Sequence, residues 1–305
     1  MLIFATSDKG GTGRSVTSSN VLYRSALQGS DVCYLDFDFG SPTAGAIFNI
    51  NHALRGTTRG GLHSYLDGAL AEPQRIDVWA DSDRPSLRDR PPGAGRLVLL
   101  PGDSGGGEFP NTRENIERCG RLFLRLDEEF DVILIDLSAG RSYATEIVLA
   151  ATARPELREL RWRWLVFHRW TRQHVLAASG LVHGQRGILE SAERNGHDRA
   201  RVANSLRFVR TAVVDPDSPE LEGLQPAQLA WLRACNQDLL ELASRERVGR
   251  TLVLGSVPLD PVLQWREQLI SDNDVWARRI ANRETVEAFD SLAKRIVDDT
   301  AWETL

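Results

Sequence analysis

Residues 8–15, DKGGTGRS, place three glycines within four positions, with Lys9 in front of them and Arg14 behind. Glycines let backbone N–H groups turn inward and approach phosphate oxygens, and a helix that starts at such a loop adds a favourable dipole. The hydroxyl of Ser15 can reach Mg²⁺. We therefore expect this loop to bind nucleotide phosphates. The expected contacts are Gly10, Gly11, Thr12, Gly13, Arg14, Ser15 and Val16.

A phosphate loop needs a strand before it and a helix after it, and the sequence predicts both. An apolar run at 2–6 precedes the glycines, and a helical pattern at 15–28 follows them. Similar runs recur along the chain, and most are continuous rather than alternating, which is typical of parallel strands covered on both faces. These further runs lie at 31–37, 96–101, 131–137, 164–167, 206–214 and 251–258. The order predicts an α/β fold, with a doubly wound, mostly parallel sheet of about seven strands flanked by helices.

Carboxylates stand at the ends of two of these expected strands. Asp36 and Asp38 close the run at 31–37, and Asp136 closes the run at 131–137. The carboxyl ends of parallel strands around a phosphate loop are where a Mg²⁺-nucleotide is held. Each aspartate taken alone also suits a strand-end cap or a turn, but three at corresponding ends favour a site. The expected metal ligands are Ser15, Asp36 and Asp136.

Composition limits the classes of function. The chain has 305 residues and a net charge of -5, which argues against a surface covered with nucleic-acid-binding cations. No apolar run approaches the ~20 residues that span a bilayer. Acidic residues follow the last amphipathic helix, at 284–298, so we expect it to dock on the core rather than on lipid. We expect one cytoplasmic domain, 1–305, with no membrane contact and with mobile loops near 81–96 and 102–111.

Together these motifs resemble the MinD/ParA family of deviant Walker-A P-loop ATPases. Residues 9–15 are similar to the family loop KGGxGK[ST], and 35–42 resemble its switch I strand. Residues 130–140 resemble its Walker B region, and 253–263 resemble the segment that lines the adenine. The likeness runs nearly end to end. It implies a P-loop NTPase fold, ATP or ADP with Mg²⁺ as cofactors, and a homodimer that forms on ATP binding.

The resemblance also assigns roles to single residues. Lys9 is the signature lysine that reaches the partner protomer's phosphates, and Asp38 orients the attacking water. Asp136 holds Mg²⁺ through water. Arg14 stands where the family has the P-loop lysine, and its guanidinium is charged but larger and planar. We therefore expect nucleotide binding to survive and hydrolysis to slow or vanish. Further nucleotide contacts are expected from Arg210, Thr211, Pro258 and Asp260.

Three functions follow from this resemblance. The first is a slow, dimerising ATPase that acts as a switch in positioning, partition or regulation, with an unidentified protein partner; the intact Ser15, Asp38 and Asp136 favour it. The second is a pseudo-ATPase that scaffolds a partner without turnover, which Arg14 favours. The third is an ATP-dependent, nonspecific DNA binder. Its basic patch would comprise Arg278, Arg279 and Arg283.

Residues 161–174, RWRWLVFHRWTRQH, interleave aromatic and basic side chains. Such a pattern can stack nucleic-acid bases, but alternate aromatics on one strand face are more simply explained by packing. The face in question carries Trp162, Trp164, Val166, His168 and Trp170. Because this strand ends at the nucleotide edge of the sheet, a dimer or partner contact there is the second interpretation. The residues concerned are His168, Arg169 and Trp170.

Overall fold

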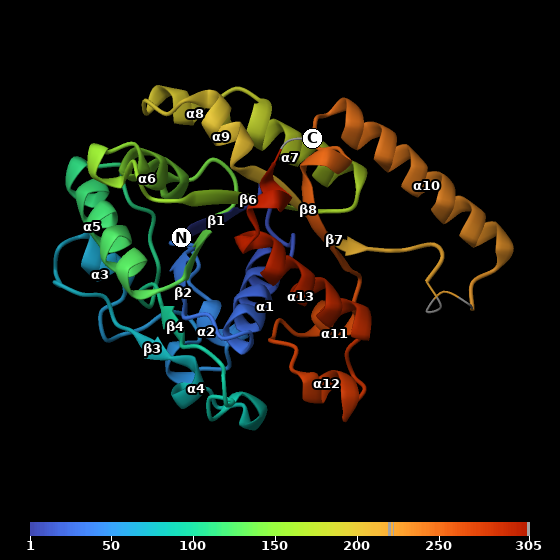
Figure 1. Cartoon of the computed structure of the whole chain (residues 1–305), viewed down its shortest axis with the longest axis horizontal. Coiled ribbons are helices and arrows are strands. Elements are labelled where there is room, and N and C mark those ends of the chain that lie inside the picture. Colours follow the sequence, from blue (N-terminus) through green and yellow to red (C-terminus); the bar gives the residue numbers. More distant parts are fainter. Residues whose placement is uncertain (219–220, 222, 304–305) are drawn as a thin grey trace.

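The structure is a computed structural model that describes residues 1–218, 221 and 223–303. At its centre lies a sheet of eight strands in the order β3-β4-β2-β5-β1-β6-β7-β8 (Figure 1). Every neighbouring pair is parallel except β3 with β4. The strands are β1 (Leu2–Thr6), β2 (Val32–Phe37), β3 (Ile76–Asp77), β4 (Leu97–Leu100), β5 (Val132–Leu137), β6 (Trp162–Arg169), β7 (Leu206–Val213) and β8 (Val253–Pro258).

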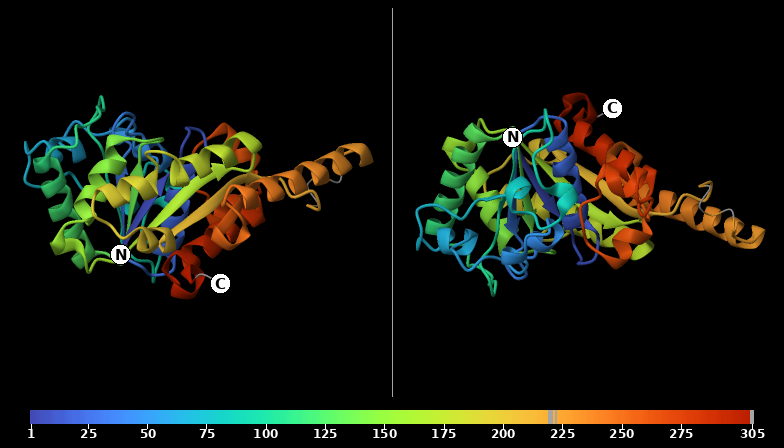
Figure 2. Two further views of the ribbon diagram at one scale, coloured as in Figure 1. Left: turned by 90° about the horizontal axis from the view of Figure 1, so that it is seen from above. Right: turned by 90° about the horizontal axis from the view of Figure 1, so that it is seen from below.

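Helices follow the strands in alternation, as the sequence predicts for a doubly wound fold. They are α1 (Arg14–Leu27), α2 (Ala44–Ile47), α3 (Leu62–Leu66), α4 (Val78–Asp81), α5 (Arg113–Glu129), α6 (Tyr143–Thr152), α7 (Arg172–His183), α8 (Ile188–Arg194), α9 (Arg199–Asn204), α10 (Pro226–Arg245), α11 (Pro261–Trp265), α12 (Asp272–Trp276) and α13 (Arg283–Val297). Helices α1 and α13 pack together on one face of the sheet, whereas α5 to α8 cover the other. Figure 2 shows α10 extending away from both layers.

Continuous burial of the central strands explains their apolar runs. In β1, Leu2 and Phe4 face the core under α5 to α8, while Ile3 and Ala5 face the core under α1 and α13. Both faces of the strand are therefore covered, and no position is left for an alternating polar residue. All seven runs identified in the sequence form strands in this sheet.

Two strands of the sheet differ from expectation. Strand β3 was not predicted, because two residues with one buried side chain carry no pattern. Strand β6 is longer than the predicted 164–167, because its backbone pairs with both β1 and β7. Trp162 and Trp164 of β6, and Trp170 directly after it, are buried in the core under α5 to α8, so packing explains these aromatic residues.

The last helix, α13, docks on the core. Its buried residues include Val286, Phe289 and Ile296, and it packs against α1 and β8. Val297, the last residue of the helix, is exposed. Among the described residues, no helix combines the length and the apolar character needed to cross a membrane.

The two loops expected to be mobile are both anchored to the body. Leu87 and Phe109 are buried. Arg84 pairs with the carboxylate of Asp274, and its guanidinium donates to the carbonyl of Leu269 at 2.5 Å. Their mobility stays a prediction.

Candidate functional site

The glycine loop lies between β1 and α1, at the carboxyl end of the central strand. Gly11 and Gly13 adopt the left-handed region, with φ of 70° and 73°. Side chains other than glycine are strained in this conformation. Gly13 is also the N-cap of α1, and its carbonyl accepts from the Thr17 N–H at 2.9 Å. The first turn of α1 holds no acidic residue, so the dipole of the helix favours an anion at the loop.

A residue of strand β7 holds the backbone of the loop through a hydrogen bond. The hydroxyl of Thr211 donates to the carbonyl of Thr12 at 2.5 Å. Thr211 therefore supports the loop backbone and also lines the adjoining cavity.

Two adjoining hollows meet at this loop. One surrounds the loop itself and reaches Asp38, Thr43 and Ala139. The other runs toward β8 and α11 and is lined by Arg169, Thr211, Val257, Pro258 and Leu263 among others. Both hollows share wall residues, so they form one groove. The shared residues are Gly11, Thr12, Gly13, Val16 and Glu267.

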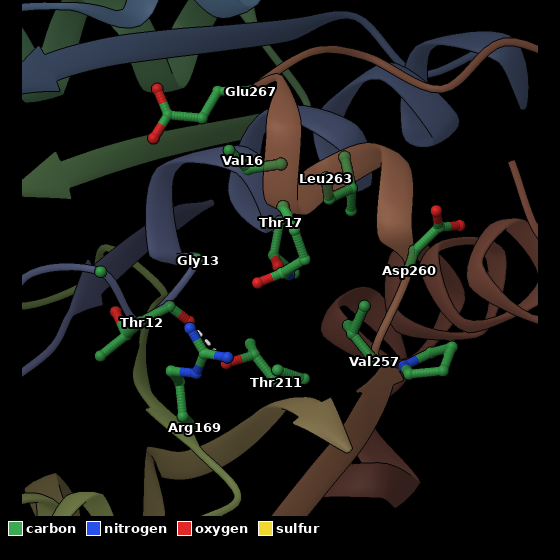
Figure 3. Close-up of a pocket in the computed structure, with 14 residues that line it drawn as sticks. Thr12, Gly13, Val16, Thr17, Arg169, Thr211, Val257, Asp260, Leu263 and Glu267 are labelled. Atoms are coloured by element: carbon green, nitrogen blue, oxygen red, sulfur yellow. Dashed lines mark hydrogen bonds between the residues drawn. The ribbon is translucent and has the colours of Figure 1, made fainter. Parts of the chain in front are cut away.

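Figure 3 shows the second hollow. Arg169 and Thr211 lie on the side opposite to Leu263 and Glu267, with Gly13 between them. The groove thus has glycine backbone and the N-terminus of α1 at the loop, and both apolar and charged side chains on the wall beyond it.

Two of the predicted nucleotide contacts have other tasks in the structure. Asp260 lines the cavity, but its carboxylate accepts from the N–H groups of Val262 and Asn282 and from the Thr285 hydroxyl, at 2.8 to 2.9 Å. It therefore shapes the wall rather than offering free oxygens. Arg210 does not line the cavity, whereas the adjacent Thr211 does, because neighbouring residues of a strand face opposite sides of the sheet. Its guanidinium instead stacks on Trp170, 3.9 Å from the ring centre.

The loop arginine points at the aspartates. Arg14 Nε donates to Asp136 Oδ1, and Arg14 Nη2 lies 3.0 Å from Asp38 Oδ2. The hydroxyls of Ser7 and Ser15 lie 3.4 Å from its two terminal nitrogens. Burial lowers the pKa of this guanidinium, but the charges of Asp136 and Asp38 outweigh it and raise the pKa above its ordinary value. Arg14 is therefore a permanent buried cation between two strand ends.

The neighbouring carboxyls are also engaged. The Tyr34 hydroxyl donates to Asp136 Oδ2 at 2.7 Å, so both oxygens of Asp136 have a donor. Asp36 pairs with Asp136 across β2 and β5 and accepts from the Ala44 N–H at 2.9 Å. Burial raises the pKa of Asp36 to about 8, with the charges of Asp136 and Asp38 acting in the same direction. Burial therefore disfavours the charged form of Asp36.

The fit of Mg²⁺ follows from these contacts. Mg²⁺ takes oxygen ligands in near-octahedral geometry. The oxygens of Asp136 face Arg14 and Tyr34, Asp36 accepts from the Ala44 N–H, and the Ser15 hydroxyl lies beside Arg14. Within the part of the chain that the structure describes, no group of three or more acidic, histidine or cysteine side chains forms a metal site. The three expected ligands therefore do not fit Mg²⁺ while Arg14 holds this position.

Lys9 lies at the rim of the loop and is half-buried. No ion pair or hydrogen bond of its ammonium occurs with any described residue, whereas the adjacent Asp8 is paired with Arg141 at 3.4 Å. The carboxylate beside the loop is thus compensated, and the ammonium remains free to reach another group.

Sequence reasoning missed three residues of this site. Arg169 was expected at this edge as a partner contact, but it forms a cavity wall, as does Glu267. Tyr34 was not considered. Its one signal is its place two residues before Asp36, which puts both side chains on the same face of β2.

Comparison with known proteins places the fold. No family model matches the sequence, and a search of curated proteins found no match. Solved structures do match. The MinD cell division protein of Aquifex aeolicus has a TM-score of 0.59 at 15% identity, over 97% of this chain and 95% of that one. MinD of Pyrococcus horikoshii OT3, complexed with Mg-ADP, has a TM-score of 0.56 at 14% identity, over 98% and 96%.

A plasmid partition protein of Borrelia burgdorferi B31, bound to AMPPNP, has a TM-score of 0.60 at 11% identity, over 97% of both chains. These identities are low, but the coverage extends over nearly the whole of each chain. The strand order, the loop after β1 and the match with these structures agree: this chain has the MinD/ParA type of P-loop NTPase fold.

Proposed function

We propose that this chain is a nucleotide-dependent switch of the ParA/MinD type, in which ATP binding drives dimerisation and engages a protein partner in the cytoplasm. The observation that carries this proposal is the single groove that runs from the glycine loop to the cavity lined by residues of β8 and α11. Phosphates on the loop amides would leave the ribose and base between Thr211 and Pro258. Structures of this fold bound to Mg-ADP and to AMPPNP support ATP or ADP as the ligand.

Dimerisation rests on Lys9. Its ammonium has no partner among the residues that the structure describes, and a flexible point charge at the rim of the loop can reach a phosphate on a second protomer. A solved MinC:MinD complex of the same fold supports a protein partner. The identity of that partner does not follow from the site.

A binding titration tests the proposal. In a calorimetric titration, ATP should bind saturably to the wild-type protein. Gly13→Val should abolish binding, because valine is strained at φ of 73°. Gly180→Val is the matched control, since a Cβ at Gly180 in α7 meets no atom within 4 Å and the residue lies outside the groove. Absence of binding up to millimolar ATP would refute nucleotide-dependent function.

The rate of turnover separates two forms of this function. In a slow ATPase, Asp38 would orient the attacking water. In a scaffold without turnover, bound ATP would only hold a conformation for the partner. The contacts of Arg14 with Asp38 and Asp136 favour the scaffold, because the groups that would serve hydrolysis already hold a guanidinium.

Phosphate release with and without Arg14→Lys tests this choice. Lysine cannot span both carboxylates, so the variant should release Asp38 and raise turnover by about tenfold, or about 1.4 kcal/mol of barrier. Turnover in the wild type that Arg14→Lys leaves unchanged or lowers would instead favour the slow ATPase.

DNA binding is less well supported by the basic patch. Arg278 pairs with Asp274 at 3.3 Å, and Arg283 pairs with Glu287 at 2.5 Å. Two of the three arginines of this patch thus lie beside a carboxylate of the chain. We expect no retention of duplex DNA at physiological salt, with or without ATP, in a filter-binding assay.

A further inference from the structure

Arg14 occupies the place that the resemblance assigns to Mg²⁺. Its guanidinium contacts Asp136, Asp38, Ser7 and Ser15, which surround the carboxyl ends of β1, β2 and β5. A P-loop cation that served only the phosphates would point along the groove toward the ligand. This one lines the hollow around the loop, but its guanidinium is held against the carboxylates of Asp136 and Asp38.

A guanidinium suits this position. Its planar fork of five N–H donors can bridge two carboxylates and two hydroxyls at once, and it is not deprotonated in proteins. The side chain of Arg14 is 6% exposed and that of Asp136 is 2% exposed, so water screens the pair little. A metal ion that took Asp136 as its ligand would have to displace the guanidinium. The displaced guanidinium would then lie as a second cation close to the metal ion.

Tyr34 forms a hydrogen bond with the carboxylate oxygen of Asp136 that Arg14 does not contact. Its hydroxyl donates at 2.7 Å, and its ring packs edge-on against Phe48, 5.4 Å between centroids. The tyrosine is fully buried in β2, so it cannot swing away to admit a hydrated cation without opening the core. Each oxygen of the carboxylate that would hold a metal therefore already accepts from a buried neighbouring side chain.

We propose that Arg14 is a built-in counter-ion that replaces the divalent cation, so that this chain binds its nucleotide without Mg²⁺. The inference rests on the proposed nucleotide binding and holds for either form of that function. The phosphates would be held by the loop amides and by the N-terminus of α1. Arg169 adds a further cation on the wall of the cavity.

The test compares ATP affinity in excess EDTA with ATP affinity in excess MgCl₂, by calorimetry on the full chain. We expect the two Kd values of the wild type to agree within about threefold. Arg14→Lys cannot keep both carboxylate contacts and should make binding at least about tenfold tighter in MgCl₂ than in EDTA. Arg24→Lys is the matched control: Arg24 lies in the same helix, is buried, and pairs with Asp272 at 2.6 Å, far along the helix from the loop. Its ratio of Kd values should equal that of the wild type.

The outcomes separate this inference from the proposed function. ATP binding that requires MgCl₂ by tenfold or more in the wild type overturns the metal-free site while leaving nucleotide binding intact. Absence of binding under both conditions overturns the proposed function itself. The wild-type comparison decides the question by itself if Arg14→Lys fails to fold, and an unchanged ratio in a folded Arg14→Lys would show that Arg14 does not exclude the metal.

Discussion

Asp136→Asn should destabilise the folded protein even in the absence of nucleotide. The substitution keeps the shape of the side chain but removes the negative charge that accepts from Arg14 Nε. Breaking a buried ion pair by removing one partner typically costs 3–5 kcal/mol, because the other charge is left uncompensated. The arginine is 6% exposed and the aspartate 2% exposed, so this pair belongs to the buried class.

The expected loss lies at the lower end of that range. Asp38 remains 3.0 Å from Arg14 Nη2, and its 28% exposure lets water share in compensating the charge. The asparagine can still accept from the Tyr34 hydroxyl. We therefore expect a loss of about 3 kcal/mol in the free energy of unfolding.

Urea denaturation at pH 7.5 measures this loss, and a double-mutant cycle assigns it to the pair. Arg14→Met with Asp136→Asn should lose clearly less than the sum of the two single variants. Asp272→Asn is the matched control: it removes the partner of Arg24, but Asp272 is 61% exposed, so we expect a loss below about 1 kcal/mol. A loss of that size in Asp136→Asn, or additive single variants, would mean that Arg14 does not pair with Asp136 in solution.

Three other predictions concern separate parts of the molecule. Lys9→Arg should weaken ATP-driven dimerisation while monomers still bind ATP, because a planar fork poorly replaces a compact ammonium; light scattering with a non-hydrolysable analogue would detect an unaltered dimer if this is wrong. Burial lowers the pKa of His168 from 6.5 to about 4, so its contribution to stability is present above pH 6.5 and is lost as pH falls toward 4. Between pH 7.5 and pH 5 the wild type should lose about 2 kcal/mol more than His168→Phe in urea titrations, and equal losses would contradict the shift. Because α13 is docked on the core, the protein should not sediment with anionic vesicles with or without ATP, and ATP-dependent pelleting would show that this helix leaves the core.

The sequence by itself was sufficient for the framework. Seven strands and the helices around the glycine loop follow from local patterns, because buried parallel strands need continuous apolar runs and a phosphate loop needs glycines between a strand and a helix. The same patterns placed Asp36, Asp38 and Asp136 together, since parallel strands end at one edge of their sheet. The short antiparallel β3 escaped prediction, because it is defined by its pairing with β4 rather than by a pattern of its own.

Only the tertiary structure decided what the site residues contact. Arg14 and Asp136 are 122 positions apart, and nothing local to either residue predicts that the guanidinium lies against the carboxylate. The carboxylate of Asp260 accepts hydrogen bonds from the Asn282 N–H and the Thr285 hydroxyl. These two donors lie near Asp260 because α13 packs beside β8. Such contacts depend on side-chain direction and on the distance between elements that are remote in sequence. For that reason the sequence predicted a nucleotide site, whereas the exclusion of a metal from it emerged only from the fold.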